Sequence, residues 1–247
     1  QTVPASVAFD GTTGVTITPA TELDLGTRYT VTVTQGIRDL AGNPLADEYN
    51  WSFTTTEAVW RESALVEADD GAAFFSDVDM NNDGEAIAVW TQSVGGPVTQ
   101  VWANNYELGS GWDTAVRIDS SDFYADAPVI SFDTVGNAVA VWLQDNGAFS
   151  FNVWANVYTA GQGWGTAQLI ETGRGSAGTP QLLMVDDGTA LVTWAQDVGA
   201  SEVGVFVNAY DPEAKTWGTA ERIDAGGGIA DDPRIAVDGL GGRTVVW

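Results

Sequence analysis

Two sets of residues in this sequence have the chemical character and spacing of a binding site. The first is the acidic segment Asp79–Gly84, which places side-chain oxygens at Asp79, Asn81 and Asp83 and a glycine at its sixth position. Alternating oxygen ligands followed by glycine form the front half of a calcium loop, so these residues predict a Ca²⁺ site. Hairpin turns use the same residue types, so an ordinary turn is the alternative interpretation.

The second set is a Trp-x-Gln pattern that occurs three times in the same register. An aromatic ring beside an amide suits a sugar, whose C–H face stacks on the ring while its hydroxyls form hydrogen bonds. The pattern predicts one glycan pocket per repeat. The alternative is that the tryptophans fill space between repeats and the amides satisfy buried backbone groups. The pairs are Trp90 with Gln92, Trp142 with Gln144, and Trp194 with Gln196; Asn-x-Tyr pairs follow each of them, at Asn104/Tyr106, Asn156/Tyr158 and Asn208/Tyr210.

Catalysis is constrained by the residues that are absent. The 247 residues include no histidine and no cysteine, which excludes a Ser-His-Asp triad, a Cys-His pair and a histidine-ligated zinc site within this sequence. Glycoside hydrolysis needs only two carboxylates at a defined separation, so it stays open. Ordinary surface groups account for the acidic residues more simply, and we therefore expect no enzyme activity.

The charge of the chain limits its partners. Thirty-four acidic residues oppose nine basic ones, which gives a net charge of −25. Nucleic acids and anionic membranes bind through Lys/Arg patches, so neither is expected as a partner. No run of about 18 apolar residues is present, so direct membrane insertion is not expected either. Carboxylates in excess fit a protein bathed in salt or divalent cations, with Ca²⁺ as the one candidate cofactor.

Tryptophans that recur at a fixed interval define the elements that must position these residues. Trp90, Trp142, Trp194 and Trp247 are separated by 52, 52 and 53 residues. Such a period indicates one supersecondary unit copied in tandem. Each copy contains four short β-runs closed by Gly/Asp/Asn-rich turns, which is typical of a β-propeller blade. The run 138–142 is apolar on both faces, as expected for a sheet packed between two neighbours.

The repeats predict how residues 58–247 are organised. We expect four-stranded antiparallel blades near 76–118, 127–170 and 179–223, a partial blade at 232–247, and an extra outer strand at Trp60–Val66. About three and a half blades do not close a ring, because propellers need roughly four to eight. We therefore expect the ring to be incomplete in this chain and the chain to be a segment of a longer protein.

Residues 1–57 have a different pattern, with alternating β-branched residues that predict half-buried strands. The segments Leu25–Val33, Ile37–Leu45 and Trp51–Thr55 resemble the second half of a bacterial Ig-like domain of the type found in S-layer and cell-surface proteins. This resemblance implies a partial β-sandwich, an extracellular or cell-surface location, and a role as a spacer or adhesive module. The predicted fold is therefore all-β, with a partial Ig-like β-sandwich followed by propeller blades.

These observations together predict a non-catalytic extracellular or cell-surface module that serves in binding, adhesion or scaffolding within a larger protein. Its expected partners are glycans or other cell-surface or matrix proteins. The first alternative is a glycan-binding propeller lectin. The second alternative is a glycoside hydrolase that uses paired carboxylates.

Overall fold

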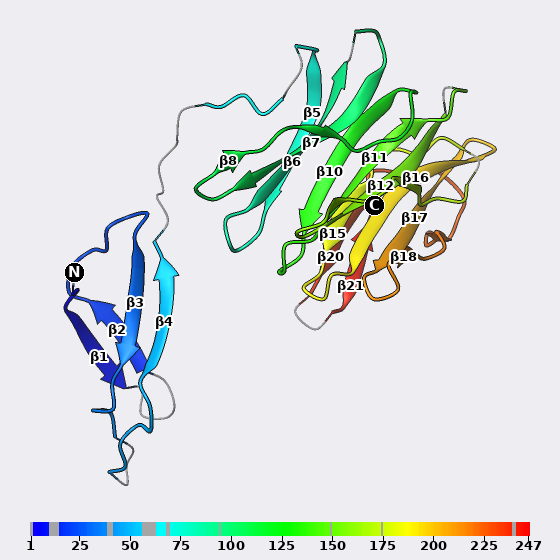
Figure 1. Cartoon of the computed structure of the whole chain (residues 1–247). Helices are drawn as coiled ribbons and strands as arrows, with labels where there is room; N and C mark the ends of the chain where they lie inside the picture. Colours follow the sequence, from blue (N-terminus) through cyan, green and yellow to red (C-terminus); the bar gives the residue numbers. More distant parts are fainter. Residues whose placement is uncertain are drawn as a thin grey trace. The chain divides into compact units, whose positions relative to one another are not determined.

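The computed structural model describes residues 2–9, 15–38, 42–55, 63–67, 70–93, 95–148, 150–173, 175–238 and 241–247. The chain folds as two compact units, Gln1–Ala64 and Leu65–Trp247. Both are built from antiparallel strands, and the described residues contain no helix (Figure 1). Within these ranges no helix has the length and apolar character needed to cross a membrane. The predicted domain boundary at 57–58 lies outside the described residues.

The first unit consists of two hairpins. Strand β1 (Ala5–Phe9) pairs with β2 (Val15–Pro19), and β3 (Arg28–Val33) pairs with β4 (Tyr49–Thr54). Alternation in β3 turns every second side chain toward the partly buried face, as the period of two requires. Tyr29 and Phe53 stack across the second hairpin with ring centroids 5.9 Å apart. This aromatic pair helps to hold β3 and β4 together, because cross-strand neighbours lie close enough for their side chains to interact.

The second unit contains three five-stranded sheets and a final hairpin. In each sheet three long strands are followed by an outer edge made of two short pieces, both paired with the third strand. The predicted fold class, antiparallel four-stranded blades, is confirmed; the division of the outer strand into two short pieces is not apparent from the sequence. The strands are β5 (Ala73–Met80), β6 (Ala86–Ser93), β7 (Thr99–Glu107), β8 (Gly111–Trp112) and β9 (Val116–Arg117); β10 (Ala125–Phe132), β11 (Ala138–Asp145), β12 (Phe151–Thr159), β13 (Gly163–Trp164) and β14 (Gln168–Leu169); β15 (Gln181–Met184), β16 (Ala190–Gly199), β17 (Glu202–Asp211), β18 (Thr216–Trp217) and β19 (Glu221–Arg222); β20 (Arg234–Val237) and β21 (Arg243–Val246).

The middle sheet lies between two hydrophobic cores. Ala138, Ala140 and Trp142 on one face of β11 pack in a core with β6 and β7 of the preceding sheet. Val139 and Val141 on the opposite face pack in a second core with β16 of the following sheet. All five side chains are fully buried. A strand buried on both faces explains the continuous apolar run in the sequence.

Side chains of each inner strand hold the next sheet in register. Asp77 Oδ2 accepts the backbone N–H of Ile130 at 3.0 Å. Asp79 Oδ2 accepts that of Phe132 at 2.8 Å. At the following junction a serine hydroxyl, Ser131 Oγ, accepts the N–H of Met184 at 3.2 Å. The inner strands therefore run side by side, and the sheets succeed one another as blades do (Figure 1).

The predicted outer strand at Trp60–Val66 is only partly covered by the structure. Residues 60–62 lie outside the described ranges, and 63–66 form no strand. The Val66 carbonyl nevertheless accepts the side-chain amide of Asn104 at 2.7 Å. Asn156 donates in the same way to Ile118 O at 2.9 Å, and Asn208 to Ile170 O at 2.7 Å. Val66 thus takes the place of the residue that follows the outer strand of a preceding blade.

Candidate functional site

The Trp-x-Gln pairs lie in the interior between sheets. The three indoles are at most 4% exposed and the three glutamines at most 2%. Within each pair the indole Nε1–H donates to the glutamine Oε1, over 2.9, 3.2 and 3.1 Å in chain order. A buried ring offers no face to a sugar from solution, so the structure favours the packing interpretation over the predicted glycan pockets at Trp90/Gln92, Trp142/Gln144 and Trp194/Gln196.

The predicted calcium loop is a tight turn between β5 and β6. Asp79 accepts backbone N–H groups on both carboxylate oxygens, from Met80 and from Phe132. Asn81 Oδ1 accepts those of Asp83 and Glu85, each at 3.0 Å. Three of the oxygens that the loop would offer a cation therefore bond to the backbone in this structure. Among the described residues no group of three or more acidic side chains has a metal-binding arrangement. Calcium binding at Asp79, Asn81 and Asp83 stays a prediction.

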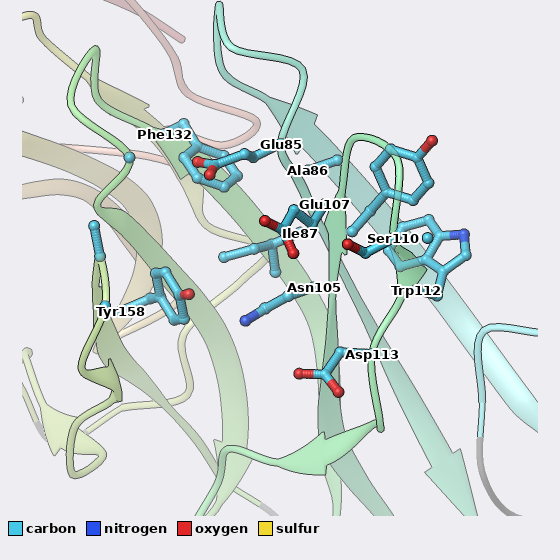
Figure 2. A pocket seen from close by; sticks show the side chains of 15 residues that line it. Glu85, Ala86, Ile87, Asn105, Glu107, Ser110, Trp112, Asp113, Phe132 and Tyr158 are labelled. Carbon is cyan, nitrogen blue, oxygen red and sulfur yellow. The ribbon is translucent and has the colours of Figure 1, made fainter.

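A groove lies between the first two five-stranded sheets, at the end where the β5–β6 and β7–β8 turns meet β12. Its first hollow, of about 510 Å³, is lined by three carboxylates, of Glu85, Glu107 and Asp113, and by aromatic side chains from both sheets. Figure 2 shows Asn105 and Tyr158 pointing toward each other from facing strands, with Glu85 and Asp113 on either side. A cavity of this size, with converging polar groups and aromatic walls, is the usual form of a small-ligand site.

Two of the carboxylates affect the pKa of Tyr158, which belongs to the neighbouring sheet. Burial, together with the negative charges of Glu85 and Asp113, raises the pKa of the Tyr158 phenol above its usual value. Burial is the larger cause of this shift, because it disfavours the charged phenolate. Each carboxylate adds a negative charge, which disfavours the negative phenolate further. The phenol therefore stays protonated at neutral pH and can donate a hydrogen bond.

Each of these carboxylates is oriented by one bond to the protein. Glu85 Oε2 accepts the Asn81 side-chain amide at 2.7 Å. Asp113 Oδ1 accepts the Thr114 backbone N–H at 2.8 Å. In the part of the chain that the structure describes, no hydrogen bond reaches the second oxygen of either group. Both residues are exposed to the groove, so one oxygen of each is available to a ligand.

Aromatic pairs form the side walls of the groove. Tyr106 and Trp112 meet edge to face with centroids 5.4 Å apart, and Tyr158 and Trp164 repeat this contact at 5.5 Å in the next sheet. Fixed edge-to-face pairs hold ring faces at the groove without loss of rotamer freedom on binding. Of the repeated Asn-x-Tyr pairs, Tyr106 and Tyr158 are therefore brought together here. The Trp-x-Gln pairs are not.

Sequence reasoning missed Glu85 and Asp113 as a pair, although a signal was present. Asp113 stands where the later repeats have Gly165 and Gly218, directly after the outer-strand tryptophan. Glu85 stands where the next repeat has Asn137. Departures from a repeated pattern are expected at functional positions, and both carboxylates are such departures.

Comparison with known proteins agrees with this two-part organisation. Residues 1–55 match the family described as bacterial Ig-like domain, which confirms the resemblance at that level. No curated protein matches the chain. Among solved structures, a Hadza microbial sialidase is similar with a TM-score of 0.47 and 12% identity, over 62% of this chain and 38% of that protein.

Two further structures show the same level of similarity. A protein of unknown function from Dyadobacter fermentans has a TM-score of 0.49 and 12% identity, over 73% of this chain and 63% of its own. An endo-arabinase from Bacteroides thetaiotaomicron has a TM-score of 0.44 and 12% identity, over 88% and 83%. The chain thus spans less than two thirds of the length of the sialidase and of the Dyadobacter protein.

The neighbours named by an activity are glycoside hydrolases. This finding contradicts the prediction of a non-catalytic binding, adhesion or scaffold module, and it agrees better with the second alternative drawn from the sequence. A similarity at 12% identity concerns the fold. Any activity of this chain must therefore be inferred from its own groove.

Proposed function

We propose that the second unit is a glycoside hydrolase and that Glu85 and Asp113 are its paired carboxylates. The observation that carries the proposal is that Glu85, Asp113 and Tyr158 line one open groove with aromatic walls. This reaction suits a chain without histidine or cysteine, because two carboxylates are sufficient for it.

The chemistry assigns one role to each carboxyl group. One, protonated, gives its proton to the glycosidic oxygen as the bond from that oxygen to the anomeric carbon breaks. The other, ionised, either attacks the anomeric carbon or removes a proton from the water that does so. Tyr158 would donate a hydrogen bond to the sugar, and the rings of Tyr106 and Trp112 would contact its C–H face.

The setting that we infer is extracellular or at the cell surface, with glycans as partners. The bacterial Ig-like match over residues 1–55 supports this, because such modules are typical of secreted and surface proteins. The proposal also includes an S-layer type for the Ig-like module and a 52-residue blade repeat throughout the whole protein. It further includes any activity that requires additional blades.

The test is release of reducing sugar by the full chain from arabinan, from xylan and from a sialyl-oligosaccharide. We expect cleavage of at least one neutral polymer, and a loss of about 10²–10⁴-fold in rate for Glu85→Gln and for Asp113→Asn, the usual contribution of an acid–base group. Glu213→Gln, an exposed position outside the groove, is the matched control and should keep the wild-type rate. Folding of each variant is checked by its melting temperature.

Two outcomes would refute the proposal. The first is hydrolysis that survives both carboxylate substitutions, since the catalytic groups would then lie elsewhere. The second is tight glycan binding without turnover of any substrate, which would leave a lectin, the first alternative from the sequence.

A further inference from the structure

The hollow described above continues into a second one along the same blade junction. The second hollow, of about 600 Å³, runs past β9 and the Trp164–Thr166 turn of the neighbouring sheet. Four residues line both hollows: Asn105, Asp113, Tyr158 and Gly161. Each hollow alone has the volume of a complete small-ligand site. The two hollows together form one groove. Tyr158 and Asp113 lie in its middle, where the hollows meet.

The walls of this groove carry polar atoms without partners. Within the described residues, six buried side-chain nitrogen or oxygen atoms lack a hydrogen bond, and four of them belong to residues that line the groove. They are the amide oxygens of Asn104, Asn105 and Asn156 and the indole nitrogen of Trp164. Buried polar atoms normally have partners, so such a concentration is exceptional.

The orientation of the two buried asparagines is fixed. Both are 3% exposed. The Asn104 amide nitrogen donates to Val66 O and Asp113 O, at 2.7 and 2.9 Å. The Asn156 amide nitrogen donates to Ile118 O and Gly165 O, at 2.9 and 3.2 Å. Their oxygens are therefore held as acceptors, and the Trp164 N–H in the same groove is a donor. Hydroxyl groups can bond to both kinds of atom, because they donate and accept.

The charge of the groove selects among sugars. Four carboxylates line it, those of Glu85, Glu107, Asp113 and Asp119. Its one guanidinium, that of Arg117, is held by Asp119 at 2.7 Å and by Asp122 at 3.2 Å. An anionic sugar would thus meet like charges with no unengaged cation to offset them, in a chain that already carries a net charge of −25.

We infer that this groove binds an extended, uncharged glycan across Tyr158, so that the bond placed between Glu85 and Asp113 is an internal bond of a neutral polymer. The inference deepens the proposed function and rests on it for the cleavage step. Binding along the groove, in contrast, requires only the contacts on either side of Tyr158. Sialosides and uronate polymers are excluded as substrates by the charge of the walls.

The experiment measures binding by calorimetry at low ionic strength with the full chain carrying Glu85→Gln, which prevents turnover. The probes are xylo- and arabino-oligosaccharides of two and six residues and an oligogalacturonide of six residues. We expect the better of the two neutral hexasaccharides to bind at least tenfold more tightly than its disaccharide, and the oligogalacturonide not to bind.

Trp164→Phe removes the indole N–H at the far end of the groove and should weaken hexasaccharide binding about tenfold while leaving disaccharide binding unchanged. Trp217→Phe is the matched control, since Trp217 has the same place in the next sheet, against Tyr210, and does not line the groove. Equal affinity for the two lengths, or binding of the uronate, would overturn the inference. Length-dependent binding to a chain that cleaves nothing would refute only the proposed hydrolysis, whereas cleavage confined to terminal sugars would refute only the extended substrate.

Discussion

Replacement of Gln196 by methionine tests whether the Trp-x-Gln pairs hold the blades together. Gln196 is 1% exposed and makes three side-chain hydrogen bonds. Its Oε1 accepts the Trp194 indole N–H at 3.1 Å, and its Nε2 donates to Gly175 O at 3.0 Å and to Glu171 Oε2 at 2.6 Å. Methionine has a similar volume, so the substitution removes these bonds with little change in packing.

The expected loss follows from the three bonds. Two neutral hydrogen bonds contribute about 1 kcal/mol each, and one to a carboxylate about 1.5–3 kcal/mol, so the free energy of unfolding should fall by about 3.5–5 kcal/mol. Glu171 is 5% exposed, so its carboxylate would be left buried without this donor. The assay is urea unfolding at pH 7, followed by far-ultraviolet circular dichroism.

Gln144→Met is the matched control for the charged bond. Gln144 occupies the same position in the middle sheet, but its Nε2 donates to the carbonyls of Phe123 and Tyr124, at 2.6 and 3.2 Å, and not to a carboxylate. With the bond from the Trp142 indole, Gln144 makes three neutral hydrogen bonds, so we expect a smaller loss, of about 3 kcal/mol. A loss below about 1 kcal/mol for Gln196→Met, or equal losses for the two variants, would refute the reasoning.

Three further predictions follow from individual residues. Gly136 has φ +90° and lies against Glu85, whose Oε2 would be 3.4 Å from an added Cβ. Gly136→Ala should lower the free energy of unfolding by about 1 kcal/mol in a melting experiment and should slow hydrolysis. An unchanged stability together with an unchanged rate would refute the contact. Calcium binding at Asp79 predicts a lower melting temperature in a chelator, because a ligand of the folded state stabilises it, whereas an unchanged midpoint would leave this loop a turn. The hydrogen-bonded Arg222 lowers the pKa of Asp224 well below its usual 3.8. The stability that this pair contributes is complete above about pH 4 and is lost as the pH falls through the lowered pKa. Asp224→Asn should therefore flatten the dependence of stability on pH below about pH 4, and parallel profiles for the variant and the wild type would contradict this.

The fold could be predicted because its main determinant is local and repeated. A strand buried on both faces requires a continuous apolar run, and Ala138–Trp142 shows that run in the sequence and full burial in the structure. The constant tryptophan interval then indicates that the same strand occurs in each copy. The Ig-like match over residues 1–55 could likewise be predicted, because the segments Leu25–Val33, Ile37–Leu45 and Trp51–Thr55 resemble that family.

The candidate site could not be predicted to the same extent, because it forms between copies. Glu85 and Asp113 belong to one sheet and Tyr158 to the next, and only the packing of β10 against β5 and β6 brings the three together. The sequence predicts an aromatic-plus-amide site at the Trp-x-Gln pairs, whose rings the packing between sheets buries. Periodicity does not distinguish a ring that faces a neighbour from one that faces a groove.

The most direct test of the central claim is a crystal structure of the full chain carrying Glu85→Gln, soaked with the neutral hexasaccharide that binds best. We predict sugar density across Tyr158, with one glycosidic oxygen between residue 85 and Asp113 and further sugar rings reaching Trp164. Sugar bound elsewhere, with this groove empty, would contradict the account.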